Sequence, residues 1–90
     1  MRRRALRRRY GRANVWAGEP VLVRIKTAGG AHSFRHSPLV STTTSGIALD
    51  MAANQRPGTV IEVVVGKLKY SYRVGRLAGL PSVTRIKRSA

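Results

Sequence analysis

The clearest pattern in the chain is a pair of alternating segments, TVIEVVV and LKYSYRV, which are joined by Gly66-Lys67. Alternation of apolar and polar positions is typical of a strand with one buried face. A two-residue loop that begins with glycine suits a type II′ turn, and this turn sets the register of the predicted hairpin. Six apolar or aromatic side chains then share one face, which we expect to be buried: Ile61, Val63, Val65, Leu68, Tyr70 and Tyr72. On the other face, Glu62 lies diagonal to Lys69 and Arg73.

A second hairpin is predicted upstream, where VLVRIKTA and AHSFRHS flank Gly29-Gly30. In this register Arg24 lies directly opposite Arg35, and such an opposition of like charges destabilises a sheet. Two interpretations stay open: an anion bound between the two side chains removes that cost, or the side chains splay apart in water. A loop longer than two residues would change this pairing. The apolar face of this hairpin combines Val21, Val23 and Ile25 with Phe34, His32 and His36.

Between the hairpins, SPLVSTTTS is typical of a loop and SGIALDMAANQ of a short helix. Thr44 or Ser45 is the expected N-cap, because a hydroxyl at this position accepts a hydrogen bond from the first turn. Ile47 and Met51, at i,i+4 spacing, form the expected buried pair. The predicted fold is therefore α+β, mostly β, with a ββαββ core of two hairpins and one short helix.

Three regions are expected along the chain: an N-terminal arm (residues 1–18), the β-rich core (19–76) and a basic C-terminal tail (77–90). The arm opens with MRRRALRRRYGR, which holds seven Arg and no acid. Like charges this dense oppose helix formation, so we expect an arm that is disordered or ordered only by a partner. Trp16 is interpreted as an apolar side chain that pins the arm to the core, with stacking on bases as the alternative. The tail has room for a short edge strand.

Charge is the feature that bears most on function. Lys and Arg number 18 and Asp and Glu three, which gives a net charge of +15 over 90 residues. Self-repulsion at this density opposes a compact state. A chain of phosphates turns that cost into binding energy, because each neutralised phosphate releases condensed counterions. Fourteen of the cations are Arg, which pairs with phosphate through two parallel hydrogen bonds.

These observations predict a protein that binds nucleic acid through the phosphate backbone, with DNA favoured over RNA and with little dependence on base sequence. No element that reads bases is evident, and we expect no cofactor and no small-molecule substrate. The residues predicted to bind nucleic acid come from the arm, the polar strand faces and the tail: Arg2, Arg3, Arg4, Arg7, Arg8, Arg9, Tyr10, Arg12, Arg24, Lys26, Arg35, Lys69, Arg73, Arg76, Arg85, Lys87 and Arg88.

Side chains suited to catalysis are sparse. The three acids, Glu19, Asp50 and Glu62, are scattered, and the chain has no Cys. His32 and His36 are expected on a half-buried strand with no acid nearby to complete a metal site. Acid–base chemistry needs positioned proton donors and acceptors, which this pattern does not supply. We therefore predict no catalytic activity and no metal site.

The opening MRRRALRRRYGR resembles the Arg-rich N-termini of small genome-packaging proteins and capsid arms in single-stranded DNA viruses, including the microviruses. The resemblance implies a structural protein that neutralises a packaged genome, located in the virion or the host cytoplasm, with a capsid or similar assembly as partner. It covers about twelve residues, and the segment from GEPVLV to SYRVGR departs from those proteins, which usually lack a folded core. Two alternatives stay open: a component of the ribosome or another ribonucleoprotein, and a free single-strand-binding or regulatory protein.

Overall fold

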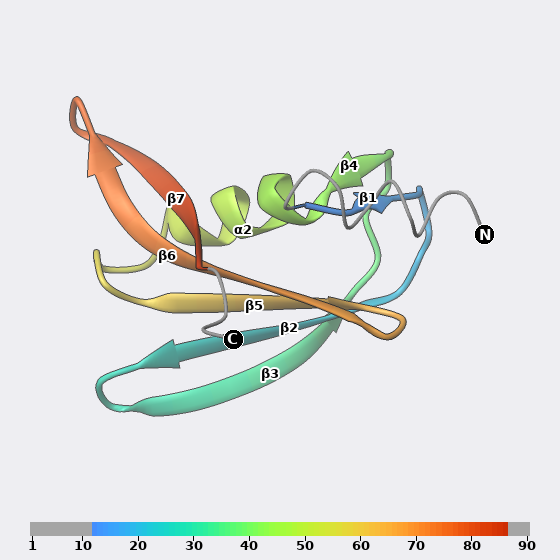
Figure 1. Ribbon diagram of the computed structural model, residues 1–90, viewed down its shortest axis with the longest axis horizontal. Helices are drawn as coiled ribbons and strands as arrows, with labels where there is room; N and C mark the ends of the chain where they lie inside the picture. The colour runs from blue at the N-terminus through green and yellow to red at the C-terminus, as the bar shows by residue number, and fades with distance from the viewer. Residues whose placement is uncertain (1–11, 87–90) are drawn as a thin grey trace.

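A five-stranded antiparallel sheet is the main element of the computed structural model, which describes residues 12–86 (Figure 1). Its strand order is β3-β2-β5-β6-β7. The strands are β2 (Val21–Thr27), β3 (Gly30–His36), β5 (Val60–Val65), β6 (Leu68–Leu77) and β7 (Leu80–Ile86). Two short strands, β1 (Asn14–Val15) and β4 (Thr42–Thr43), pair with each other, and helix α2 (Thr44–Ala52) follows β4 directly. The fold is therefore α+β and mostly β, as predicted.

The β5–β6 hairpin has the predicted register, in which Val65 pairs with Leu68 and Ile61 with Tyr72. Gly66 has a φ of 59°, as the first residue of a type II′ turn requires. The predicted apolar face is confirmed. Five of its six side chains are buried and the sixth, Leu68, is partly buried against them.

The β2–β3 hairpin differs from the prediction by two residues. Its loop is Ala28-Gly29, so that Arg24 pairs with Ser33 and not with Arg35. The Thr27 hydroxyl stabilises the turn in this position, since it accepts from the Gly29 N–H at 3.2 Å and donates to the Gly30 carbonyl at 3.1 Å. The predicted pairing of Arg24 with Arg35 is therefore wrong. An anion bound between the two side chains is no longer needed to explain how the sheet tolerates them. A shift of two residues leaves every side chain on its predicted face.

Helix α2 begins earlier than predicted. Its N-cap is Thr43, whose hydroxyl accepts from the Gly46 N–H at 3.0 Å, so the prediction of Thr44 or Ser45 is wrong. Thr44 is fully buried. Its hydroxyl accepts from the Ala13 N–H at 2.9 Å and lies 2.8 Å from the Tyr72 hydroxyl. The Thr44 N–H in turn donates to the Ala13 carbonyl at 2.8 Å. Thr44 therefore joins the segment before β1, the start of α2 and strand β6.

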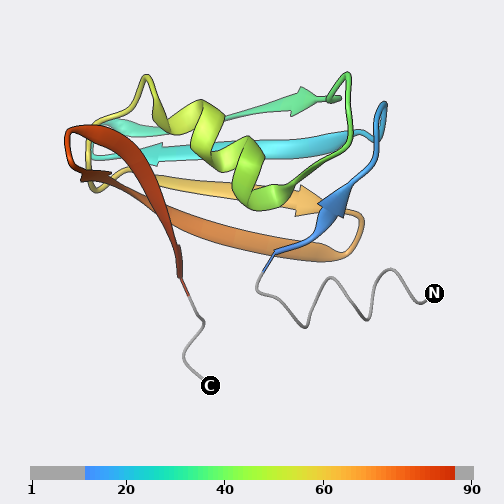
Figure 2. The same ribbon diagram turned by 90° about the horizontal axis from the view of Figure 1, so that it is seen from above.

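Helix α2 crosses one face of the sheet, with β1 and β4 beside it on the same side (Figures 1 and 2). Ile47 is buried and Met51 packs partly buried against the core, as expected from their spacing, while Leu49 is exposed. The core consists of Ile47, Ala48 and Ala52 of the helix, the apolar strand faces, and two residues near the start of the described chain, Ala13 and Val15.

Both predicted boundaries of the core differ in the structure. Ala13 and Val15 are fully buried, so the folded part begins before Glu19. Trp16 is half-buried at a turn in which its N–H donates to the Glu19 carboxylate at 3.0 Å. At the other end, β7 pairs with β6 over seven residues, so residues 77–86 belong to the sheet. The main sheet and helix therefore follow the order ββαβββ, with one strand more than predicted. Residues 1–11 of the arm and 87–90 of the tail lie outside the described residues.

The two faces of β5 can be tested by placing a charge on each in turn. Val63→Asp should lower the free energy of unfolding by several kcal/mol, because it buries an unpaired carboxylate. Val64→Asp is the matched control, since Val64 lies one residue away on the opposite face and pairs with Lys69. Chemical denaturation of both variants measures the difference. Equal losses would mean that the faces are wrongly assigned.

The Thr44 junction can be tested with two substitutions. Thr44→Val removes the acceptor of the Ala13 N–H and one hydrogen bond of Tyr72 at nearly constant volume, and should cost about 1–3 kcal/mol of unfolding free energy. Thr44→Ser keeps the hydroxyl and should recover most of that loss. Thermal and chemical unfolding report the result, and equal stability of the Val variant and the native protein would contradict the role given to this hydroxyl.

Candidate nucleic-acid interface

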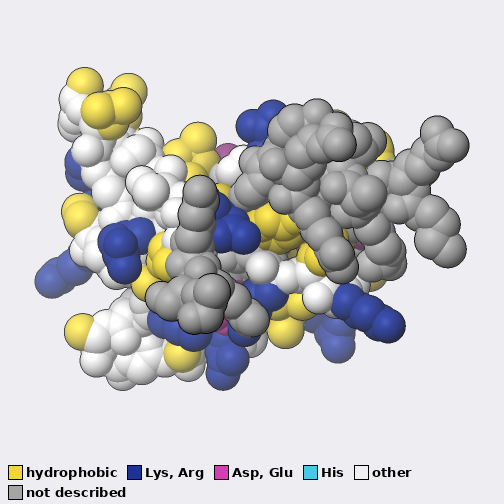
Figure 3. Space-filling model, viewed as in Figure 1, with side chains coloured by type: hydrophobic (Ala, Val, Ile, Leu, Met, Phe, Trp, Pro, Cys, Tyr) yellow, Lys and Arg dark blue, Asp and Glu magenta, His cyan; other side chains and the backbone are white. Residues whose placement is uncertain are grey.

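The described elements outside the main sheet, α2, β1 and β4, all lie on one side of it (Figure 1), so no other element of residues 12–86 covers the opposite face. Because successive side chains of a strand point to opposite faces, the polar positions of β2, β3 and β6 gather there. Five cations, all exposed, occupy this face: Arg24, Lys26, Arg35, Lys69 and Arg73. We call it the basic face. Lys and Arg side chains are spread widely over the surface seen in Figure 3, with little acidic surface among them.

The cations of the basic face lie on either side of β5. Arg24 and Lys26 on β2 and Arg35 on β3 form one group, the β2–β3 ridge. Lys69 and Arg73 on β6 form the other, the β6 ridge. Between the ridges, β5 presents Val60, Glu62 and Val64. The pairing of β2 with β5 and of β5 with β6 fixes this order across the sheet.

Glu62 is the acid of the basic face and is buried, with 7% of its surface exposed. It pairs with Arg24 on β2 and with Ser71 on β6, and its carboxylate binds the Lys26 ammonium at 2.8 Å. Burial opposes its ionisation, but the hydrogen bond and charge of Lys26, together with Lys69 and Arg24, outweigh burial and lower its pKa from 4.5. The carboxylate is therefore held ionised among the cations. Its diagonal position to Lys69 and Arg73 was predicted, whereas the bond to Lys26 was not.

Two further predicted residues lie on the other side of the sheet. The Arg85 guanidinium stacks over the Tyr70 ring, 4.8 Å from its centroid, and is half-buried. Arg76 shares the face of Tyr72 and Val74 and donates to the Gln55 carbonyl at 3.4 Å. Arg12 is exposed at the start of the described chain. The remaining predicted residues lie outside the described range: Arg2, Arg3, Arg4, Arg7, Arg8, Arg9, Tyr10, Lys87 and Arg88.

The two histidines lie on the helix side of β3, which is an edge strand. His32 is exposed and stacks on Phe34 with a centroid distance of 6.3 Å, while His36 is half-buried. Within residues 12–86, no three His, Cys, Asp or Glu side chains lie close enough to hold a metal ion.

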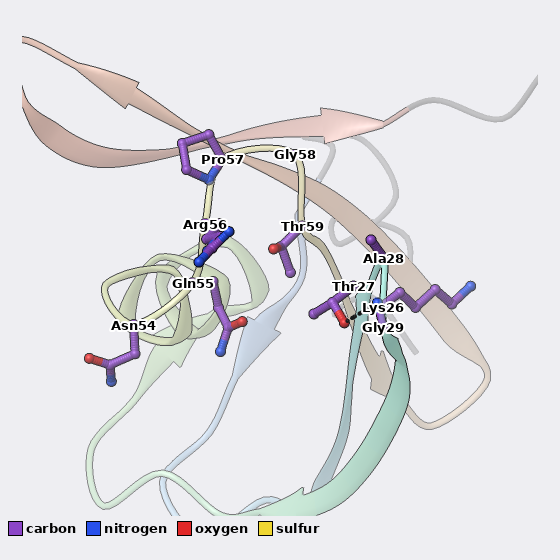
Figure 4. A pocket seen from close by; sticks show the side chains of 10 residues that line it. All are labelled: Lys26, Thr27, Ala28, Gly29, Asn54, Gln55, Arg56, Pro57, Gly58 and Thr59. Atoms are coloured by element: carbon purple, nitrogen blue, oxygen red, sulfur yellow. Dashed lines mark hydrogen bonds between the residues drawn. The ribbon is translucent and has the colours of Figure 1, made fainter.

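A pocket of about 670 Å³, which the sequence did not indicate, opens between the β2–β3 turn and the loop that follows α2 (Figure 4). Its lining includes Asn54, Gln55 and Arg56 from the loop and Thr27 to Gly29 from the turn. Lys26 also borders it, but the Lys26 side chain extends away from the loop. The pocket forms where two loops far apart in the sequence meet, so no local pattern marks it.

Comparisons with protein-family models, with curated proteins and with solved structures find no match. Among residues 12–86, no helix has the length and apolar character needed to cross a membrane. Function is therefore inferred from the charge and geometry of the chain itself.

The lowered pKa of Glu62 predicts a contribution to acid stability. A carboxyl whose pKa is lower in the folded state stabilises the fold above its unfolded value, here 4.5, and this contribution is lost as pH falls through the folded pKa. Glu62→Gln should therefore flatten the loss of stability below about pH 4.5. Asp50→Asn, on the exposed side of α2, is the control. Unfolding measured from pH 3 to 7 tests this, and identical profiles for Glu62→Gln and the native protein would contradict it.

Proposed function

We propose that this protein binds nucleic acid through its phosphates, without reading base sequence and without catalysing a reaction. The observation that carries the proposal is the basic face, where five exposed cations surround one ionised carboxylate, a local net charge of 5 − 1 = +4. Arg and Lys on an open surface bind phosphate oxygens and release counterions. The seven arm arginines, which are Arg2, Arg3, Arg4, Arg7, Arg8, Arg9 and Arg12, extend the same chemistry along the chain.

The described strands of this face present neither a recognition helix nor aromatic side chains for stacking, which supports binding that is independent of base sequence. The aromatic side chains on the strands of the main sheet, Phe34, Tyr70 and Tyr72, lie on the helix side, so these strands offer no aromatic side chain to bases on the basic face. Helix α2 carries Asp50 and no Lys or Arg, which makes it a poor recognition helix. Phosphate contacts position a protein on nucleic acid but carry little sequence information.

Binding without catalysis is supported by how the carboxylates are used. Glu62 is bonded to Lys26 and Glu19 accepts from the Trp16 N–H, so both hold structure together. Asp50 is exposed on α2.

We also propose that the protein acts within a larger protein assembly such as a capsid, in line with the resemblance of the arm to viral genome-packaging proteins. Exposed apolar residues gather in two chain segments, one after β3 and one at the turn between β6 and β7, and these segments lie at different ends of the sheet (Figure 1). Leu39 and Val40 follow β3, and Leu77 and Leu80 form the tip of the β6–β7 hairpin, where they are 73% and 67% exposed. Groups of exposed apolar residues mark contacts with partner proteins, which suits a genome-binding structural protein of a virion.

The salt dependence of binding tests the proposed function. Replacing the seven arm arginines by Gln should flatten the slope of log K against log[salt] by about 4–6 units, at about 0.7–0.9 per neutralised phosphate. The rest of the chain keeps 11 cations and three acids, a net +8, and should retain weaker binding. Replacing the same arginines by Lys is the control, which keeps the slope while losing some affinity because bidentate pairing is lost.

Each protein is titrated with salt on two oligonucleotides of equal length and unrelated sequence. A preference above about a hundredfold between them would contradict binding through phosphates alone, since discrimination of that size needs contacts to base edges. A slope that the Gln substitutions leave unchanged would place the phosphate contacts on the folded part instead of the arm.

A further inference from the structure

The spacing of the two ridges bears on the kind of nucleic acid that the basic face can accept. Neighbouring strands of a sheet lie about 4.8 Å apart, so the backbones of β2 and β6 are separated by about 10 Å and those of β3 and β6 by about 14 Å. Each ridge runs along its strand direction, and Lys69 and Arg73 are spaced by about 13 Å on β6. The basic face is thus two parallel tracks of positive charge and not one central patch.

The strip between the tracks is unsuited to phosphate. Glu62 lies at its centre as an ionised carboxylate, and Val60 and Val64 on either side offer no side-chain hydrogen-bond donor. A single phosphate backbone laid along β5 would find no free cation in this strip, because the charge of Glu62 is balanced by the bonded Lys26 ammonium. Phosphates are therefore directed to the two ridges and away from the middle.

The shape of the sheet is consistent with this division. Strands β6 and β7 curve toward the side on which α2 lies, so the basic face is the outer, convex side of the sheet (Figure 1). A convex face with two charged tracks fits a groove bordered by two phosphate backbones. Such grooves measure about 6–12 Å across in B-form DNA, and long Arg and Lys side chains adjust the reach from each track. Single strands are usually held by stacking on aromatic side chains, which this face does not provide.

From these observations we infer that the basic face binds double-stranded nucleic acid, with one ridge on each of the two phosphate backbones that border a groove. The inference rests on the proposed function and adds to it the class of nucleic acid. The contacts are to phosphates, which duplex DNA and duplex RNA share.

The test uses the full-length chain with the seven arm arginines replaced by Gln, so that the arm does not hide the contribution of the folded part. Two double variants remove one ridge each: Arg24→Gln with Arg35→Gln, and Lys69→Gln with Arg73→Gln. Lys26 is left intact because it bonds to Glu62. Arg56→Gln with Arg76→Gln is the matched control, which removes the same charge outside the basic face. Salt titrations are run on a duplex of about twenty base pairs, in DNA and RNA forms, and on its separate strands.

On a duplex, each ridge variant should flatten the slope of log K against log[salt] by about 1.8, and the combination of both by about 3.6, since two contacts of about 0.9 each are lost per ridge. On a single strand, one ridge suffices, so either double variant should change the slope by less than about 0.5 while the combination removes about 1.4. The control should leave both slopes unchanged, and Arg24→Lys with Arg35→Lys should keep the slope of the parent. Thermal unfolding confirms that the variants are folded.

The outcomes separate the two proposals. The inference is supported if the two ridge variants lower the slope additively on the duplex, whereas on the single strand only their combination lowers it. Comparison of the DNA duplex with the RNA duplex shows which of them is preferred. The same response on duplex and single strand would overturn the inference while leaving phosphate binding intact. A parent protein whose binding to every probe is insensitive to salt, or a control as damaging as the ridge variants, would overturn the role of the basic face itself.

Discussion

The hydroxyl of Thr44 is the contact on which the arrangement of the layers depends. It accepts from the Ala13 N–H and bonds the Tyr72 hydroxyl, so the residue before β1, the first turn of α2 and the middle of β6 meet at one buried atom. Strands β1 and β4 pair over only two residues each, which is too little to hold a segment by itself. The junction therefore fixes where the arm leaves the fold, and it orients α2 so that Ile47, Ala48 and Ala52 close the core.

On the side opposite the core, the same strands carry the basic face, whose charges lower the stability of the fold. Five like charges on one sheet face repel one another, and they are offset within the chain by one carboxylate. One carboxylate is effective because of its position: Glu62 lies in the central strand, where it interacts with Lys26, Lys69 and Arg24 together. The remaining excess of positive charge is available to phosphate. Under the proposed function, a bound polyanion neutralises this excess and relieves the repulsion.

Local and non-local features differed in how well the sequence predicted them. The β5–β6 register was predictable because Gly66-Lys67 and the alternation on both sides agree. The β2–β3 register was not, since Gly29 and Gly30 allow two loops and the Thr27 hydroxyl decides between them. The run of hydroxyl residues before Gly46 likewise offers several N-caps, and the buried bonds of Thr44 leave the role to Thr43.

The five cations were assigned to the right face because a slip of two residues preserves the face. The bond between Lys26 and Glu62, in contrast, depends on the pairing of β2 with β5, and these two residues are 36 apart in the chain. Arg76 and Arg85 lie on the helix side of the sheet. Their placement was not predicted, because β6 is longer than expected and β7 is a full strand.

Strand β1 lies on the α2 side of the sheet, so the described chain begins on the side away from the ridges (Figure 1). The described chain measures 36 × 32 × 27 Å along its principal axes, and its thickness separates the start of β1 from the ridges. Duplex DNA keeps its direction over about 500 Å, so a duplex seated on the ridges does not fold back around a body of this size to meet the root of the arm. Under the proposed function, a second segment of nucleic acid bound on the side where β1 begins would be joined to the first through the thickness of the protein, which is the geometry of a cross-link in a compacted polymer.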